Sequence, residues 1–165
     1  MVTRLFFDCE FTNLKDSASL ISAGFVTQSG DPFYVELSDY DEEACNDFVK
    51  ATVLPLLSLP PMSTADFLVS LTAWLRHFGE ELLFIADSEW DQKILVKTFA
   101  AHGQSLPANW HFQNTPDNFT NGQQRCLFND EMAAFFLRHP DQKKHHALTD
   151  ARAIRQAYLR AESGL

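Results

Sequence analysis

The sequence predicts a single α/β domain over residues 1–165, in which a mixed five-stranded sheet carries helices on both faces. Three observations lead to this prediction. The length of 165 residues fits one hydrophobic core, which typically takes about 100 to 200 residues. The 45% hydrophobic and 21% charged residues match a globular protein and exclude a disordered or fibrous chain. Strand-like segments come first along the chain, and helix-like segments alternate with strands afterwards.

The first three predicted strands form an antiparallel meander. Residues 2–7 are apolar except at Thr3 and Arg4, and residues 21–27 are apolar and rich in β-forming side chains. A turn that contains Gly-Asp-Pro then leads into the third strand, residues 33–37. Because sequential strands usually pair as neighbours, these three are expected to lie side by side.

Helices and strands alternate in the rest of the chain. An acidic segment at residues 38–43 offers capping side chains for a first helix. Apolar residues at helical spacing predict further helices at residues 64–78, 90–101, 129–138 and 147–161. Residues 82–86 form a continuous apolar run typical of a buried parallel strand, residues 110–113 are a fifth strand, and residues 115–125 have no readable pattern. This order of elements is typical of an RNase H-like architecture.

The charged residues are unevenly distributed along the chain. The formal net charge is −9, which by itself argues against a nucleic-acid partner. Residues 1–91 hold 16 acidic and 4 basic residues, whereas residues 92–165 hold 6 acidic and 9 basic residues. An anionic partner is therefore expected to meet the C-terminal half of the chain, unless bound metal ions mask some of the acids.

Membrane, secretory and disulfide-rich classes are disfavoured. No apolar run approaches the roughly 20 residues that a membrane-spanning helix needs. Too few apolar residues precede Asp8 for a secretory signal, so a cytoplasmic protein is expected. Cys9, Cys45 and Cys126 are odd in number and widely spaced, which predicts reduced thiols and argues against a thiolate zinc site.

Two carboxylates close the first predicted strand. Asp8 and Glu10 are two residues apart, and because side chains alternate along a strand, both point to the same face of the sheet. There they are able to share one cation. The alternative is that the strand simply ends in a solvated loop, which is common for an isolated Asp-x-Glu.

A third carboxylate falls on the apolar side of the last predicted helix. Asp150 shares a helical stripe with Ala147, Ala151, Ile154 and Tyr158. A carboxylate buried there costs several kcal/mol or becomes protonated, unless a metal or a base satisfies it. This cost favours a functional role for Asp150.

Two further residues are candidates by position. Asp91 begins a helix just after the apolar strand at residues 82–86, where ligands commonly bind; a helix cap is the alternative, and Asp87 is a competing acid. His145 lies five residues before Asp150 on a loop and is able to accept a proton near pH 7, although a solvated loop histidine is common. A zinc site of His139, His145 and His146 is disfavoured because no cysteine or acid completes a regular ligand spacing.

Three motifs together resemble those of the DEDDh 3′-to-5′ exonucleases. They are FDCEFT at residues 7–12, DSEWD at residues 87–91 and HHALTD at residues 145–150, and their order and spacing extend over nearly the whole chain. The third motif is the most specific. The short chain and its opening FFDCEF are similar to small stand-alone bacterial and prophage 3′-to-5′ exoribonucleases, more than to proofreading subunits.

This resemblance implies an RNase H-like fold and a site with two divalent ions, Mg²⁺ or Mn²⁺. The family's four carboxylate positions fall on Asp8, Glu10, Asp91 and Asp150. His145 is implied as the general base, since it rather than His146 has the family spacing to Asp150. The segment that grips the terminal nucleotide falls on Phe11, Thr12, Asn13 and Leu14. Asp87 departs from relatives, which often carry Asn there, and its charge is expected to alter metal or nucleotide binding.

The implied activity is metal-dependent hydrolysis of single-stranded or 3′-overhang RNA to nucleoside 5′-monophosphates. Two alternatives stay open: a DNA exonuclease of the repair or proofreading type, because the motifs serve both nucleic acids, and an inactive nucleic-acid-binding module, against which the intact acids argue. Dimers are frequent among the small relatives, so a homodimer is one expectation. Four basic residues flank the site in sequence and are candidates to steer phosphates: Lys143, Lys144, Arg152 and Arg155.

Overall fold

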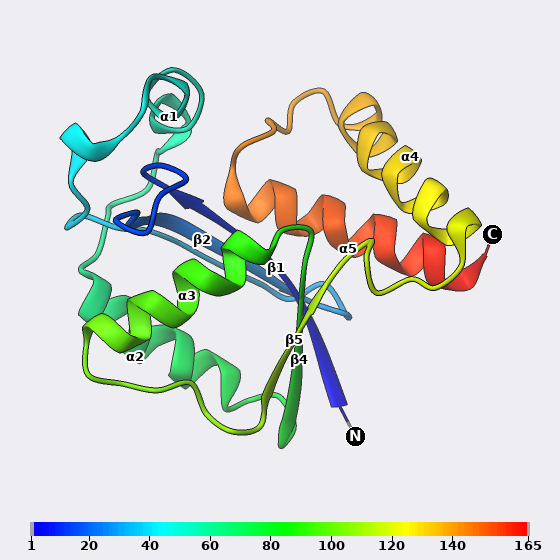
Figure 1. The fold of residues 1–165 in the computed structure, drawn as a ribbon, viewed down its shortest axis with the longest axis horizontal. Coiled ribbons are helices and arrows are strands. Elements are labelled where there is room, and N and C mark those ends of the chain that lie inside the picture. Colours follow the sequence, from blue (N-terminus) through cyan, green and yellow to red (C-terminus); the bar gives the residue numbers. More distant parts are fainter. Residues whose placement is uncertain (1, 165) are drawn as a thin grey trace.

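The computed structural model describes residues 2–164 and contains a mixed five-stranded sheet in the order β3-β2-β1-β4-β5, with helices packed on it (Figure 1). This is an RNase H-like topology, and the predicted fold class is confirmed. The strands are β1 (Val2–Phe11), β2 (Leu20–Thr27), β3 (Pro32–Glu36), β4 (Glu81–Ala86) and β5 (Trp110–Asn114).

The strand pairings confirm the predicted meander. Strand β1 lies at the centre of the sheet, antiparallel to β2 and parallel to β4. Strand β3 pairs antiparallel with β2, and β5 pairs parallel with β4. The pairing of β1 with β4 ends at Phe6, whereas its pairing with β2 continues to Phe11. The last residues of β1 therefore have a free side, and the candidate site lies there.

Most helices begin at a side-chain cap, as the polar residues between elements predict. Ser63 and Ser88 accept backbone N–H groups at the starts of α2 and α3. The helices are α1 (Asp47–Thr52), α2 (Thr64–Leu75), α3 (Glu89–Ala101), α4 (Gly122–Arg138) and α5 (Ala147–Ser163), with 3₁₀ turns at Glu42–Ala44 and Leu54–Leu56.

Two helix predictions differ from the structure. The acidic segment gives only a 3₁₀ turn capped by Asp41, and the α-helix starts later, after the cap residue Asn46. Helix α4 begins at Gly122 rather than residue 129, because Asn121 caps it within the segment that had no readable pattern. Polar residues fill the first turn of α4 and hide its helical periodicity there, whereas α1 is only six residues long and is too short to show a periodicity.

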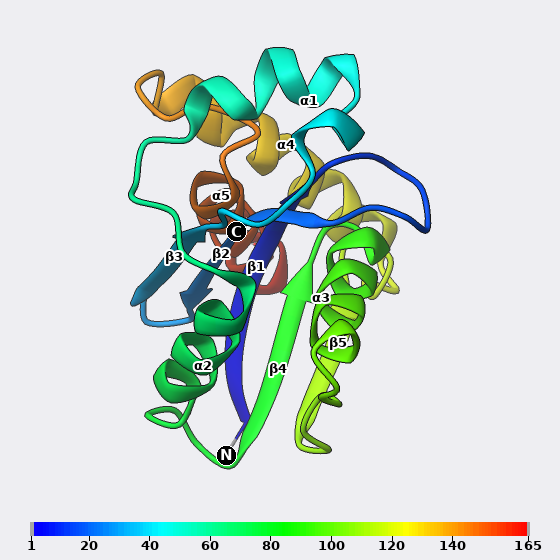
Figure 2. The ribbon, with the colours of Figure 1, turned by 90° about the vertical axis from the view of Figure 1, so that its left-hand side faces the viewer.

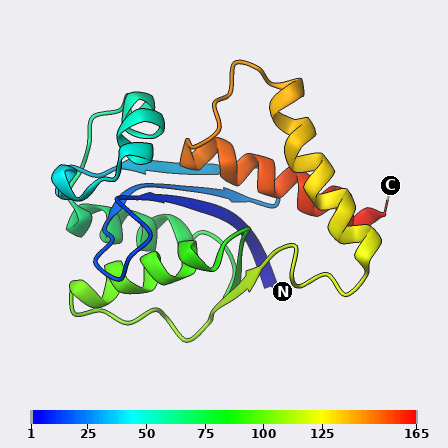
Figure 3. The ribbon, with the colours of Figure 1, turned by 45° about the horizontal axis from the view of Figure 1, so that its top comes forward.

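Alternating side chains of the central strand serve two separate cores. Phe7 faces the core beneath α2 and α3, which contains Phe67 and Leu95. Its neighbour Phe6 faces the core beneath α5, which contains Ile154. Figures 2 and 3 show α2 and α3 on one face of the sheet and α5 on the other, with α4 packed against α5. Helices thus cover both faces, as predicted.

The N-terminal end of α5 comes very close to the sheet. A Cβ atom placed on Gly24 of β2 would lie 2.4 Å from the backbone nitrogen of Leu148, which is closer than real Cβ contacts. Only glycine permits this approach. The close approach sets how far the start of α5 lies from the end of β1.

The cysteines and the helices bear on the thiol and membrane predictions. Cys9, Cys45 and Cys126 are free cysteines, as predicted. Within residues 2–164 no helix has the length and apolar character needed to cross a membrane.

Candidate metal centre

Residues of the three motifs converge at one end of the sheet. Asp8 and Glu10 come from β1, and Asp91 comes from the first turn of α3. His145 lies just before the first residue of α5, and Asp150 lies in the first turn of α5. All five line one cavity of about 290 Å³. The cavity therefore contains every residue that the sequence assigned to metal binding or proton transfer.

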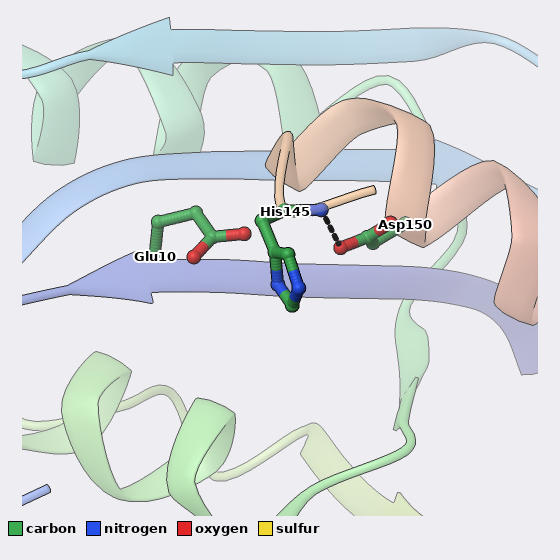
Figure 4. Close-up of side chains that lie close together, drawn as sticks. All are labelled: Glu10, His145 and Asp150. Atoms are coloured by element: carbon green, nitrogen blue, oxygen red, sulfur yellow. Dashed lines mark hydrogen bonds between the residues drawn. The ribbon is translucent and has the colours of Figure 1, made fainter. Parts of the chain in front are cut away.

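The side chains in this cavity form two groups that could each hold a metal ion. The ligand atoms of Glu10, His145 and Asp150 lie within 4.8 Å of one another, and Figure 4 shows Glu10 and Asp150 on either side of His145. The ligand atoms of Asp8, Asp87 and Asp91 form the second such group. Because Asp8 and Glu10 point to the same face of β1, the two groups lie next to each other.

Two of the carboxylates are fixed by backbone donors. The N–H of Cys9 donates to Asp91 Oδ1 at 2.9 Å, because β4 no longer pairs with β1 at this residue. The N–H of His145 donates to Asp150 Oδ2, also at 2.9 Å. The first bond joins the motif at residues 7–12 to the motif at residues 87–91, and the second lies within the motif at residues 145–150. Each bond leaves the second carboxylate oxygen without a hydrogen-bond partner.

Three buried carboxylate oxygens of the cavity have no hydrogen-bond partner. They are Asp8 Oδ2, Asp91 Oδ2 and Asp150 Oδ1. A buried acceptor without a partner is costly, and buried polar groups are normally satisfied. A cation would satisfy all three oxygens, and carboxylate oxygen is the ligand type that Mg²⁺ and Mn²⁺ prefer. The donor set therefore fits divalent metal ions.

The electrostatics of the cluster agree with this interpretation. Burial and then repulsion from neighbouring acids raise the pKa of Glu10 to about 8. Burial also raises the pKa of Asp150 to about 7, although the His145 N–H opposes this change. For Asp8 and Asp91 the pKa is raised well above the usual value, again mainly by burial. Without a cation, these raised pKa values keep protons on the cluster at a pH where ordinary carboxylates are charged. A bound cation would favour the charged carboxylates.

His145 is held in an unusual backbone conformation. Its φ of 67° lies in the left-handed region, which few non-glycine residues adopt. Its ring packs edge-on against Phe48 of α1, with 5.0 Å between the ring centroids. Burial, together with the nearby Lys144, lowers the pKa of the imidazole, so the neutral form dominates at pH 7. A neutral imidazole in this cavity is able to accept a proton.

Asp87 and Phe48 are among the cavity residues that the sequence did not assign to the site. Asp87 was predicted only as a disturbance to metal binding, but its carboxylate belongs to the group of Asp8 and Asp91. Phe48 is 52% exposed and lines the cavity from the short helix α1. The sequence signal for Phe48 is a large apolar residue in the first turn after the cap residue Asn46.

Three of the four residues predicted to bind the terminal nucleotide line the cavity, and the fourth supports the loop that carries them. Phe11, Asn13 and Leu14 line the cavity, and Leu14 is 64% exposed. Thr12 is completely buried, and its Oγ accepts hydrogen bonds from Ser19 N–H and the Asn13 amide. The side chain of Thr12 thus supports the loop that carries the other three.

The remaining histidines and basic residues lie in different places. His146 packs against Tyr34 and His139 against Phe135, so the disfavoured zinc trio is not brought together. Of the four basic candidates, Lys144 lines the cavity and Arg152 is exposed. Lys143 and Arg155 donate to backbone carbonyls of nearby loops.

In comparisons with known proteins, no family model and no curated protein matches this chain. The fold and the site define an RNase H-like α/β protein with a buried cluster of carboxylates that could hold metal ions.

Proposed function

We propose that the protein is a metal-dependent 3′-to-5′ exonuclease, with RNA as the preferred substrate. It hydrolyses single-stranded or 3′-overhang nucleic acid to nucleoside 5′-monophosphates. The observation that carries this proposal is the meeting of Asp8, Glu10, Asp91, Asp150 and His145 in one cavity, with three buried carboxylate oxygens left unpartnered. The resemblance of the three motifs to DEDDh exonucleases supplies the reaction type.

Four carboxylates would hold two divalent ions, Mg²⁺ or Mn²⁺, and Asp87 would add a fifth. The first four are Asp8, Glu10, Asp91 and Asp150. When bound, such ions lower the pKa of water and stabilise negative charge on phosphate oxygens. Lys144 lies beside the same cavity and offers a positive charge to an incoming phosphate.

His145 would act as the general base. Its neutral ring takes a proton from the attacking water while the water oxygen bonds to the terminal phosphorus. The bond between phosphorus and the 3′-oxygen of the preceding nucleotide breaks, and that oxygen receives a proton to become the new 3′-hydroxyl. The product is a nucleoside 5′-monophosphate.

The apolar side chains of the cavity support binding of a chain end. Leu14 and Phe48 are both exposed and line the cavity from different elements, one after β1 and one in α1. Bases pack against such side chains without needing a particular sequence. Upstream phosphates would then run toward the C-terminal half of the chain, where basic residues outnumber acidic ones. A 3′-phosphate would be repelled by the acidic cluster and crowded by the cavity wall.

A time course with matched RNA and DNA tests the proposal. Both oligonucleotides carry a label at the 5′ end and one sequence, with either a 3′-hydroxyl or a 3′-phosphate. We expect stepwise shortening from the 3′ end in Mg²⁺ or Mn²⁺, faster for RNA, slower for the 3′-phosphate and absent in EDTA.

A different result of this experiment would contradict each part of the proposal. Equal or faster digestion of DNA would overturn the preference for RNA and leave the chemistry standing, in favour of the repair or proofreading alternative. Internal cuts appearing first would contradict exonuclease action. Tight binding of both substrates with no cleavage under any metal would favour the inactive binding module.

A further inference from the structure

One row of residues runs across three strands beneath the start of α5. Tyr34 of β3 pairs with Gly24 of β2, and Gly24 pairs with Asp8 of β1. Directly paired residues point to the same face of a sheet, so the three positions lie in line on the face that α5 covers. The row connects the edge strand of the sheet with the metal centre.

The three positions meet consecutive parts of the chain above them. Asp8 contributes its carboxylate to the metal cluster. Gly24 lies under the backbone of Leu148 without room for a side chain. Tyr34 packs its ring against the ring of His146, with 4.5 Å between the centroids and an angle of 31° between the planes. Residues 146–148 are thus seated on the sheet immediately after His145.

Tyr34 is itself fixed by a buried carboxylate. Its hydroxyl donates to Glu36 Oε1 at 2.9 Å, and Glu36 is only 3% exposed. The Glu36 carboxylate also accepts the backbone N–H groups of Ser58 and Leu59. Burial and the bond to Glu36 raise the pKa of Tyr34, which keeps the hydroxyl protonated as a donor. The Tyr34 ring therefore has a defined position against which His146 packs.

We propose that Tyr34 is a positioning residue for His145, and this inference rests on the proposed role of His145 as the base. A left-handed backbone at a non-glycine residue persists only where its surroundings hold it. The His145 N–H is held by Asp150 and its ring by Phe48. Tyr34 holds the following residue through the His146 ring. Loss of that contact lets the peptide after His145 rotate and moves the imidazole away from the reacting water.

Kinetics of four variants test this inference. Tyr34→Ala is expected to lower kcat by about 3- to 10-fold, the scale of one lost aromatic contact, with KM unchanged. Tyr34→Phe keeps the ring and is expected to retain kcat within about 2-fold. His146→Ala removes the same contact from the other partner and should match Tyr34→Ala. The double variant Tyr34→Ala, His146→Ala should fall no further than either single variant, because one contact is lost only once.

A matched control comes from the same strand. Phe33 is the residue before Tyr34, and it packs on the opposite face against Phe67 and Trp74. Phe33→Ala removes a similar aromatic side chain and should lower the melting temperature without a change in kcat. Amide hydrogen exchange gives a readout apart from activity: exchange at residues 145–150 should quicken in Tyr34→Ala and stay unchanged in Phe33→Ala.

The outcomes separate this inference from the proposed function. Wild-type kcat and unchanged exchange in both Tyr34→Ala and His146→Ala would overturn it, as would an equal loss in Tyr34→Phe and Tyr34→Ala. An inactive wild-type protein would refute the proposed function, while the exchange measurement would still decide whether Tyr34 holds residues 145–150. If Tyr34→Ala does not fold, His146→Ala decides, because its ring is only half-buried.

Discussion

Asp8 and Glu10 extend from the central strand of the sheet, whereas His145 extends from an irregular loop. Strand β1 is paired with β4 from Val2 to Phe6 and with β2 from Leu5 to Phe11, and both of its acids point to one face by the ordinary alternation of a strand. His145 instead depends on one backbone hydrogen bond, one ring contact and the seating of the next residue. The part of the site proposed to bind metal is therefore built by regular structure, and the part that carries the proposed base by a few specific contacts. We call these two parts the metal half and the base half.

The acids should be the most sensitive positions in the site. Asp8→Ala and Asp150→Ala are each expected to remove nearly all activity, and EDTA should do the same to the unmodified protein, because in the proposed function the charge of the cluster holds the ions. Mononucleotide release from labelled RNA measures the loss. Asp141→Ala is the matched control, since Asp141 is an exposed acid on the loop before His145. Full turnover by Asp8→Ala, or by wild type in excess chelator, would rule out the two-metal assignment.

Substitution of His145 should have the next largest effect, a large but incomplete loss of activity. His145→Ala is expected to lower kcat by about 100- to 10,000-fold, the range for a positioned general base, with a much smaller effect from His146→Ala. Steady-state kinetics of both variants measure the difference. If His146 proves indispensable and His145 does not, the base half of the site has been assigned to the wrong residue.

Gly24 lies where the start of α5 meets the sheet, between the two halves of the site. A side chain at this position should push α5 away from β1. A methyl group would meet the backbone of Leu148, so Gly24→Ala is expected to displace the start of α5 and lower kcat by about 10- to 100-fold. Overpacking of this kind also costs about 1 to 3 kcal/mol of the free energy of unfolding. Gly122→Ala provides the control, because a Cβ there meets nothing within 4 Å. Equal kinetics for the two variants would mean that the close approach does not set the site geometry.

The smallest expected effect is a change in the pH dependence of stability when Glu10 is substituted. This measurement tests the carboxylates and does not depend on His145. In the folded protein the pKa of Glu10 is raised from 4.5 to about 8, so its contribution to stability is fully present below about pH 4.5 and is lost as the pH rises through 8. In EDTA, wild type should therefore lose a few more degrees of melting temperature between pH 5 and pH 8 than Glu10→Gln does. Added Mg²⁺ or Mn²⁺ should restore wild type at pH 8. The same pH dependence in both proteins would show that Glu10 is not buried against other acids.

Much of this structure follows from short-range patterns in the sequence. Apolar runs rich in β-forming residues predicted the first strands, and the continuous apolar run before Asp87 predicted the buried parallel strand β4. The spacing of Asp8, Glu10 and Asp150 predicted which face of its element each acid occupies, and the structure brings the three acids to one cavity. These inferences depend only on which face of an element a residue occupies.

The residues that the sequence did not reveal depend on contacts between distant elements. Phe48 meets His145 because α1 lies above the end of β1, and no periodicity reports that position. Tyr34 meets His146 through the register of three strands. Asp87 lies just past β4, and it joins a group with Asp8 of β1 and Asp91 of α3, two elements that are distant in the sequence. Such partners become visible only when the strand order and register are known.

The order in which the site's parts appear along the chain has a consequence for synthesis. Asp8 and Glu10 are made first, whereas His145 and Asp150 arrive with α5, the last helix of the described chain. A growing polypeptide lacks both the proposed base and the fourth acid until α5 has left the ribosome and docked beside Gly24. If the protein cleaves RNA as proposed, an incomplete chain on the ribosome is not able to degrade the messenger RNA that encodes it. Fragments from premature termination before α5 are inactive for the same reason.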